Sequence, residues 1–190
     1  MSESVLTKKV IADGFKAVMG KKGFEKITIA DITDHCGLNR QTFYYHFQDK
    51  YDLLNWILYN EVIVPFTNDL TIDNWNDKLL GILYVIRDNA RFYSNAFNTP
   101  HGDEFRQFLF NAVTAVLSDV IDQFADGYTI NDEDKQFIAE FLSYGVSGSV
   151  TKWVRTGMKQ TPEATAKFLQ ELVNGFKSFA ASRYFPKSKQ

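Results

Sequence analysis

The sequence predicts an all-α protein in which a small N-terminal three-helix domain, of the helix-turn-helix kind, precedes a larger helical domain. Apolar residues recur at the three- and four-residue spacing of amphipathic helices along most of the chain. Capping residues precede these segments, and glycine or proline marks several of their ends. A chain of 190 residues with 45% hydrophobic residues can bury a substantial core. We expect residues 1–48 to form the first domain and residues 49–190 the second.

The first two helices are indicated by an apolar face and by a capped start. The first helix should run from about residue 4 to residue 21. Its buried face should consist of Ile11, Phe15 and Val18. Thr28 is a good N-cap for the second helix, and Asp31 can accept the Thr28 N–H in a variant of the capping box. Gly37 stands where the chain must turn sharply, so we expect a positive φ there.

Caps also introduce the third helix and the helix that leaves the domain. Asn39 caps the third helix, and Asp49 caps the next one with Asp52 at its N3 position. Two pairs of residues have the spacing of a hydrophobic staple: Ile27 with Ile32, and Leu38 with Phe43. Phe43 and Phe47 are four residues apart, so both should face the core with Ile29 and Ile32.

The third helix carries more polar and aromatic side chains than a core can hold, which favours DNA binding. Arg40 and Gln41 stand at its start, and these residue types read guanine and adenine in the major groove. We expect the remaining candidates to contact phosphate or sugar, together with the N–H groups that follow the cap of the second helix. The predicted DNA contacts are Thr28, Asn39, Arg40, Gln41, Thr42, Tyr44, Tyr45, His46 and Lys50. The alternative is a solvated helix on the surface of a bundle.

The charge distribution permits a local DNA contact but no broad basic field. The chain has a net charge of −2, yet residues 1–50 hold eight Lys/Arg against six Asp/Glu. DNA affinity should therefore depend on a few residues such as Arg40 and Lys50.

The second domain should consist of long helices. The first of them should start at Asp49 and continue to residue 63 or 64, with Pro65 marking its end or a kink. It is apolar on more than one face, so it can pack on both domains and transmit movement between them. Further helices are expected after a cap at Asp73, at about 90–97, at about 104–124, at about 131–156 and from the Thr161 cap to about 182, with a loop at 98–103.

The last two helices have the features of a helix–helix interface. Residues 144–149 place several small residues in mid-helix, which permits close approach by another helix. The last helix has a wide apolar stripe formed by Phe168, Leu169, Leu172, Val173, Phe176 and Phe179. We expect a homodimer through these faces, because a two-fold protein doubles the length of DNA that a small domain can read. The alternative is that they pack only within one chain.

Aromatic residues are frequent in the second domain, and they are candidates for a site that binds a ligand or a partner protein. The candidates are Phe92, Tyr93, Phe97, Phe105, Phe108, Tyr144 and Trp153. An aromatic stripe at helical spacing also fits a plain core, so both interpretations stay open.

Little in the sequence favours an enzyme. The chain has three histidines and one cysteine, without zinc-site spacing or a glycine-rich phosphate loop, so we expect no catalytic residue, metal or cofactor. His101 beside Asp103 and Glu104 fits a solvated loop better than an acid–base cluster. No stretch reaches the roughly 18 apolar residues of a membrane helix, and no signal peptide precedes the first helix, so a cytoplasmic protein is expected. An interaction module that has lost DNA binding is a third possibility, but no candidate contact is missing.

Residues 37–53 resemble the helix-turn-helix signature of the TetR family of bacterial regulators, and the chain length and helix count agree with that family. The resemblance implies an all-α homodimer with a three-helix DNA-binding domain, a helical regulatory and dimerisation domain, and the DNA contacts named above. Cys36 departs from the family, which usually has a small residue there, and we interpret it as a packing substitution.

A narrower resemblance concerns residues 89–97 and 137–145, with Trp153 and residues 157–159. These segments are similar to the dihydroxyacetone-kinase regulator branch of the TetR family. That branch implies control of genes for dihydroxyacetone phosphorylation, and activation when a kinase-like co-regulator subunit docks on the protein. The alternative is a TetR-type repressor that a small hydrophobic ligand releases from DNA.

Overall fold

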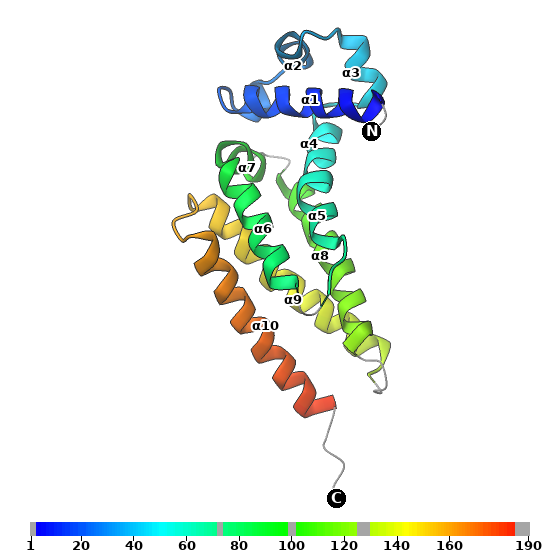
Figure 1. Ribbon diagram of the computed structural model, residues 1–190, viewed down its shortest axis with the longest axis vertical. Helices are drawn as coiled ribbons and strands as arrows, with labels where there is room; N and C mark the ends of the chain where they lie inside the picture. The colour runs from blue at the N-terminus through cyan, green and yellow to red at the C-terminus, as the bar shows by residue number, and fades with distance from the viewer. Residues whose placement is uncertain (1–2, 72–73, 99–101, 125–129, 185–190) are drawn as a thin grey trace, which may run out of the picture.

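The computed structural model describes residues 3–71, 74–98, 102–124 and 130–184; for 102–105, 108, 112, 123, 124 and 176–184 it describes the backbone alone. Every regular element in this described part is a helix (Figure 1). The elements are α1 (Glu3–Met19), η1 (Phe24–Lys26), α2 (Ile29–Cys36), α3 (Arg40–His46), α4 (Lys50–Leu58), η2 (Tyr59–Ile63), α5 (Val64–Thr67), α6 (Trp75–Asp88), α7 (Ala90–Phe97), α8 (Gly102–Phe124), α9 (Asp132–Arg155) and α10 (Pro162–Tyr184). The all-α prediction is confirmed.

Helices α1 to α3 form a compact head at one end of the molecule (Figure 1). Phe15, Ile32 and Phe43 meet in its core with no exposed surface, and Phe47 is buried beside them. This is the core that the apolar spacing predicts.

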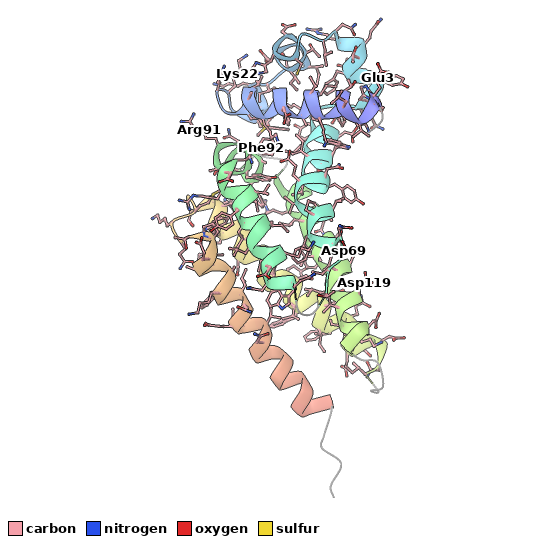
Figure 2. All side chains as sticks on the ribbon, viewed as in Figure 1. Glu3, Lys22, Asp69, Arg91, Phe92 and Asp119 are labelled. Atoms are coloured by element: carbon pink, nitrogen blue, oxygen red, sulfur yellow. The ribbon has the colours of Figure 1, made fainter. Side chains whose placement is uncertain are left out.

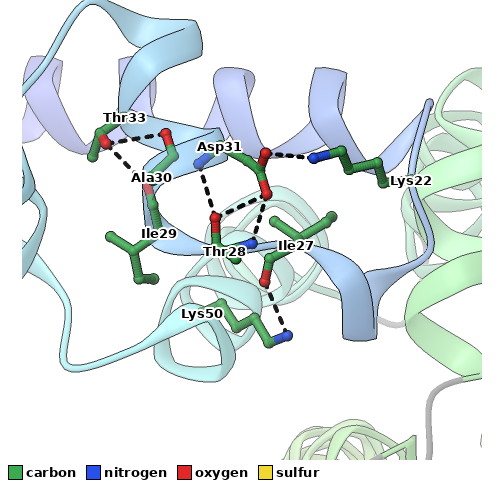
Figure 3. Close-up of polar contacts among 8 residues, drawn as sticks. All are labelled: Lys22, Ile27, Thr28, Ile29, Ala30, Asp31, Thr33 and Lys50. Carbon is green, nitrogen blue, oxygen red and sulfur yellow. Dashed lines mark hydrogen bonds and ion pairs between the residues drawn. The ribbon is translucent and has the colours of Figure 1, made fainter.

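The caps around the helix-turn-helix form as expected. The Thr28 N–H donates to Asp31 Oδ2 at 2.9 Å, and the Asp31 N–H donates to Thr28 Oγ1 at 3.2 Å (Figure 3). Gly37 ends α2 with φ of 66°, a backbone region that glycine enters at little cost. Asn39 Oδ1 accepts the Thr42 N–H at 2.8 Å at the start of α3.

The cap of α4 also forms as expected, with Asp49 as N-cap and Asp52 at N3. Asp49 Oδ1 accepts the N–H groups of Tyr51 and Asp52, at 2.8 and 2.9 Å. The Asp52 carboxylate accepts a hydrogen bond of 3.0 Å from the N–H of Gln48, the residue before the cap Asp49.

The helix that leaves the head runs farther than the sequence indicates. Pro65 was expected to end or kink it, yet helical turns continue through η2 and α5 to Thr67. The segment η2 is a π-helix, in which the Val64 N–H donates to Tyr59 O five residues back. This wide turn lies directly before Pro65, which has no N–H to donate, so the helix passes the proline without ending.

The remaining helices build the larger domain (Figure 1). Helices α8 and α9 pack along each other, and α10 packs against α6, where the Tyr84 hydroxyl donates to the Glu163 carboxylate. Asn131 caps α9 by accepting the Asp134 N–H at 2.7 Å, as predicted.

Helix ends in this domain agree with the sequence in part. Thr161 Oγ1 accepts the Ala164 N–H at 3.2 Å, so the predicted cap of α10 is confirmed, and this helix continues to Tyr184. The loop expected over 98–103 is wrong for 102 and 103, where α8 has already begun, and 99–101 lie outside the described residues. The expected cap at Asp73 also lies outside them; the described N-cap of α6 is Asn74.

Candidate nucleic-acid interface

Helix α3 has one face in the core of the head and the other in solvent. Phe43 and Phe47 anchor it, with their rings 5.8 Å apart. On the opposite side Tyr44 is 58% exposed and Tyr45 is 84% exposed. Exposure of this size for two neighbouring tyrosines is unusual on a surface without a partner, so the structure supports a binding face here.

Arg40 and Gln41 are the most available polar side chains of this face. Both are exposed in the first turn of α3, and within the described part of the chain neither makes a hydrogen bond or an ion pair. Their guanidinium and amide groups therefore need not break an internal contact to meet a base edge.

The other predicted contacts on α3 are partly engaged within the protein. The Thr42 hydroxyl donates to Asn39 Oδ1 at 3.0 Å, so both residues stabilise the helix start. The rings of Tyr45 and His46 meet edge to face at 4.9 Å, and the Tyr44 ring meets Phe43 at 5.6 Å. Contacts of this kind restrict the aromatic side chains before any DNA is bound.

The start of α2 combines a cap with a neutralised charge. Lys22 Nζ lies 2.5 Å from Asp31 Oδ1, and Asp31 also accepts hydrogen bonds from Thr28 (Figure 3). The hydrogen bond from Lys22, followed by those from Thr28, lowers the pKa of Asp31 to about 2. The carboxylate is consequently charged at neutral pH, and Lys22 offsets the repulsion that it would exert on a phosphate.

Lys50 has a structural contact that sequence reasoning missed. Its Nζ donates to the backbone oxygens of Phe24, Glu25 and Ile27, at 3.0, 3.3 and 3.2 Å, and lies 4.6 Å from the centroid of the Phe24 ring. Figure 3 shows the contact with Ile27 O. The ammonium thus holds η1 and the turn into α2 in place. This geometry favours a positioning role for Lys50, and its contact with a phosphate stays a prediction.

Cys36 is half-buried between α2 and α1. Its Sγ donates to Val10 O at 3.4 Å and occupies the space beside Gly14, where an added Cβ would lie 2.2 Å away. Burial raises the pKa of the Cys36 thiol. These contacts agree with the packing interpretation, and Gly14 is the partner that the sequence analysis did not identify.

The aromatic residues proposed for ligand or partner binding do not share one pocket. Phe92 contacts Phe15 of the head at 6.0 Å, whereas Tyr93 and Phe97 line an internal cavity. Trp153 is buried and donates to Gln160 O at 2.9 Å. Tyr144 is 68% exposed, with its ring 4.3 Å from that of Phe110. The side chains of Phe105 and Phe108 lie outside the described ones. The roles of all seven aromatic residues in ligand or partner binding stay predictions.

The internal cavity is mostly aliphatic, which the aromatic pattern did not indicate. It has a volume of about 110 Å³ and lies among α4 to α10 of the larger domain. Its wall includes Leu58, Val62, Phe66, Leu79, Ile82, Ile86, Leu109, Val113, Val116, Leu117, Val146 and Val150. The Ser147 hydroxyl at the wall donates to Ser143 O, so this polar group is satisfied without a ligand.

Among the residues that the structure describes, no group of three His, Cys, Asp or Glu side chains could hold a metal ion. No helix in the same part of the chain is both long and apolar enough to cross a membrane.

Comparison with known families agrees with this architecture. Residues 11–57, which include α2 and α3, match the bacterial regulatory proteins of the tetR family. Residues 73–175 match the transcriptional regulator C-terminal region of the same group, and this second match alone spans more than half of the chain. The chain belongs to the TetR family. This TetR-family protein is a DNA-binding transcriptional regulator and not an enzyme.

Individual relatives support the narrower branch. The HTH-type dhaKLM operon transcriptional activator DhaS of Lactococcus lactis subsp. lactis is 29% identical over 143 residues, which are 74% of this chain and 75% of DhaS. A solved structure of the dihydroxyacetone kinase operon activator DhaS has a TM-score of 0.74 at 26% identity, covering 90% of this chain and 96% of that one. The fatty acid degradation regulator FadR from Bacillus halodurans, with a TM-score of 0.62 at 18% identity over 88% of this chain and 97% of its own, shares the fold alone. The TetR-family chain is thus similar to DhaS in sequence and in fold.

Proposed function

We propose that this TetR-family regulator acts as a homodimer on an inverted-repeat operator and controls genes for dihydroxyacetone phosphorylation. The observation that carries the DNA-reading part is the start of α3, where Arg40 and Gln41 are exposed and make no contact within the described chain. The similarity of both domains to DhaS supports the gene target. Such a regulator works on the chromosome, so we infer a cytoplasmic location.

The contacts divide into two kinds. Arg40 and Gln41 read base edges in the major groove. The surrounding residues contact the phosphates and sugars of the duplex, and these contacts set the position of α3 along the DNA. These backbone contacts are Thr28, Asn39, Thr42, Tyr44, Tyr45 and His46, with Lys50 holding the turn before α2.

The dimer forms through α9 and α10. Large apolar side chains lie exposed on both helices at helical spacing, each between 56% and 68% exposed: Phe137, Phe141 and Tyr144 on α9, and Phe168 and Leu172 on α10. Gly145 and Gly148 of α9 are also exposed, and a Cβ added to either would meet no atom within 4 Å. This apolar face with small residues beside it supports close approach of a second chain.

The two predicted domains, residues 1–48 and residues 49–190, have different functions. The first part reads DNA, and the second dimerises and receives the signal. Helical turns run without a break from Lys50, beside this boundary, to Thr67, so one helix leads from the head into the second part. A dimer competent to bind holds its two α3 helices roughly 34–36 Å apart, one turn of DNA.

We infer activation as the sense of regulation, because DhaS is described as a transcriptional activator. In this proposal a dihydroxyacetone-kinase-like co-regulator protein docks on the regulatory domain and favours the DNA-competent arrangement. No cofactor or metal takes part.

The cavity supports a second candidate function, a repressor released by a small hydrophobic ligand. Its volume of about 110 Å³ is close to that of cavities which accept molecules such as benzene or xenon. Thermal melting and DNA binding with saturating benzene would test this candidate. A raised Tm with weakened DNA binding supports it, and a raised Tm with unchanged DNA binding rejects it.

The main proposal is tested by footprinting the purified protein on fragments of its own genome at stated salt. Protection of a short inverted repeat beside genes of dihydroxyacetone metabolism is the expected result. A second footprint with the purified kinase-like subunit distinguishes a regulator that needs its partner from a failed proposal. Absence of protection in both footprints rejects the proposal.

A further inference from the structure

Besides its packing on α4, the head contacts α7 of the regulatory domain through α1. The Phe15 ring of α1 meets the Phe92 ring of α7 edge to face at 6.0 Å. Figure 2 shows Phe92 just below α1. One turn farther along each helix, Asn95 Nδ2 donates to Met19 O at 2.8 Å. Helix α7 therefore supports the C-terminal half of α1.

A polar relay reinforces this support and centres on Glu61. Its Oε1 lies 2.5 Å from Lys16 Nζ of α1, and its Oε2 accepts the Tyr93 hydroxyl of α7 at 3.4 Å. One carboxylate thus connects the head, the π-helical segment η2 and α7. The Lys16 and Glu61 side chains are 18% and 26% exposed, so water screens the pair less than it screens an open surface pair.

Tyr93 connects the relay to the interior of the regulatory domain. The side chain has no exposed surface, and its ring forms part of the cavity wall. Burial, with the nearby Glu61 charge, raises the pKa of Tyr93, so the hydroxyl keeps its proton and acts as the donor. A shift of the cavity wall would therefore move the Tyr93 hydroxyl, which donates to Oε2 of Glu61.

Lys16 has a second carboxylate partner, Asp13, so its ion pair with Glu61 can be broken at a lower cost. Asp13 Oδ1 lies 3.3 Å from Lys16 Nζ, on the same helix and with a side chain that is 75% exposed. If Glu61 moves away, the ammonium keeps a carboxylate partner within α1. The tie between head and regulatory domain can therefore open without leaving an unpaired buried charge.

We propose that Glu61 is a positioning residue which, held by Tyr93, fixes the placement of α1 and with it the orientation of the DNA-reading head. This inference rests on the proposed function, because orientation matters only if two heads of a dimer must meet two half-sites. The recognition side chains lie on α3, which contributes nothing to the relay. Loss of the relay should therefore leave the half-site sequence unchanged and broaden the separation between half-sites.

The experiment is selection of binding sites from random-sequence duplex DNA by the full-length protein and its variants. E61Q keeps the size of the side chain and removes its charge, and the doubly substituted K16E/E61K restores a pair with reversed charges. Y93F keeps the ring in the cavity wall and removes only the hydroxyl. The matched control is Lys135→Met, which removes an ion pair of 2.7 Å to Asp122 within the regulatory domain.

We expect E61Q to select the same half-site sequence as the wild type. The fraction of selected sites that have the preferred separation should fall about two- to fivefold, which corresponds to the free energy of a partly exposed ion pair. Y93F should broaden the separation less, K16E/E61K should restore it, and Lys135→Met should match the wild type. An unchanged separation in E61Q overturns the proposal, as does an altered half-site, which would mean that the head itself was disturbed. If the wild type selects no repeated sequence, the proposed function fails together with this inference.

Discussion

The contact between Gly14 and Cys36 provides a quantitative test of how α1 and α2 pack. A Cβ added to Gly14 would lie 2.2 Å from Cys36 Sγ and 3.5 Å from His35 Cδ2. The first distance is far below van der Waals contact, so Gly14→Ala forces the sulfur to turn away or the helices to separate. Turning the sulfur also costs its hydrogen bond to Val10 O.

The expected magnitudes follow from two opposing effects. Replacing a mid-helix glycine by alanine stabilises a helix by about 1 kcal/mol. Overpacking costs about 1–3 kcal/mol, so Gly14→Ala alone should lower the free energy of unfolding by up to about 2 kcal/mol. Cys36→Ala alone should cost about 1 kcal/mol, because it leaves a small gap beside Gly14. In the double variant the new methyl fills this gap, so the two changes should be coupled by about 1–3 kcal/mol.

The assay is equilibrium unfolding in urea of the wild type, both single variants and the double variant. All four are compared at one protein concentration, because the apparent stability of a protein that dimerises, as proposed for this one, depends on concentration. Gly81→Ala in α6 is the matched control, since a Cβ there would meet no atom within 4 Å and the helix should gain about 1 kcal/mol. Additive changes at positions 14 and 36, or a Gly14→Ala variant as stable as the control, would refute the packing argument.

Three further outcomes concern the reading head. Arg40→Ala should weaken operator binding by about 1–3 kcal/mol and relax preference at one base position, as measured by titration against operators substituted base by base; equal losses on all sequences would mean that Arg40 reads no base. Lys50→Met should lower the free energy of unfolding in urea by about 1–3 kcal/mol, because three carbonyls lose a charged donor. The same variant tests the predicted phosphate contact of Lys50: a salt slope of DNA binding that is lower by about one supports the contact, and an unchanged slope leaves Lys50 with the structural role alone. Since Asp31 has its pKa lowered from 3.8 to about 2, its contribution to stability is full above about pH 4 and is lost as pH falls toward 2. A plot of Tm against pH should therefore fall less steeply in this range for Asp31→Asn than for the wild type.

The parts of the head that sequence predicts well are those decided by neighbours in the chain. The Thr28 cap, the Gly37 turn and the Asn39 cap each depend on residues within a few positions, and all three form as expected. A capping hydrogen bond or a positive φ depends on residues within a few positions, so both can be predicted without knowledge of the fold.

Lys50 shows what such reading misses. Its three acceptors are backbone oxygens of residues 24, 25 and 27, more than twenty positions earlier in the chain. Every residue has a carbonyl, so the sequence contains no signal for which carbonyls a lysine will meet. The assignment of Lys50 to DNA followed from residue type and helix position, and three-dimensional proximity supplied the competing partner.

The regulatory domain illustrates the same limit for apolar residues. Phe92 and Tyr93 are adjacent, yet Phe92 contacts the head whereas Tyr93 lines the cavity and reaches Glu61. Helical periodicity predicts that the two rings point in different directions, but it does not say what lies in either direction. The cavity itself is the space that side chains of several helices leave unfilled, and no single segment encodes it.

The unequal strength of the head and of its attachment indicates where regulation acts. The head has a fully buried core and capped helices, whereas the aromatic and polar contacts that hold α1 against α7 and η2 in the described chain are the Phe15–Phe92 pair, the Asn95–Met19 hydrogen bond and the Glu61 relay. Such contacts together provide a few kcal/mol, and reversing a two-state equilibrium from about 1:99 to 99:1 requires about 5.5 kcal/mol. Breaking the attachment alone can therefore shift the orientation of the heads but cannot switch it completely. In the proposed mechanism the docking partner supplies the remainder by binding one arrangement more tightly than the other, because a partner with equal affinity for both would shift nothing.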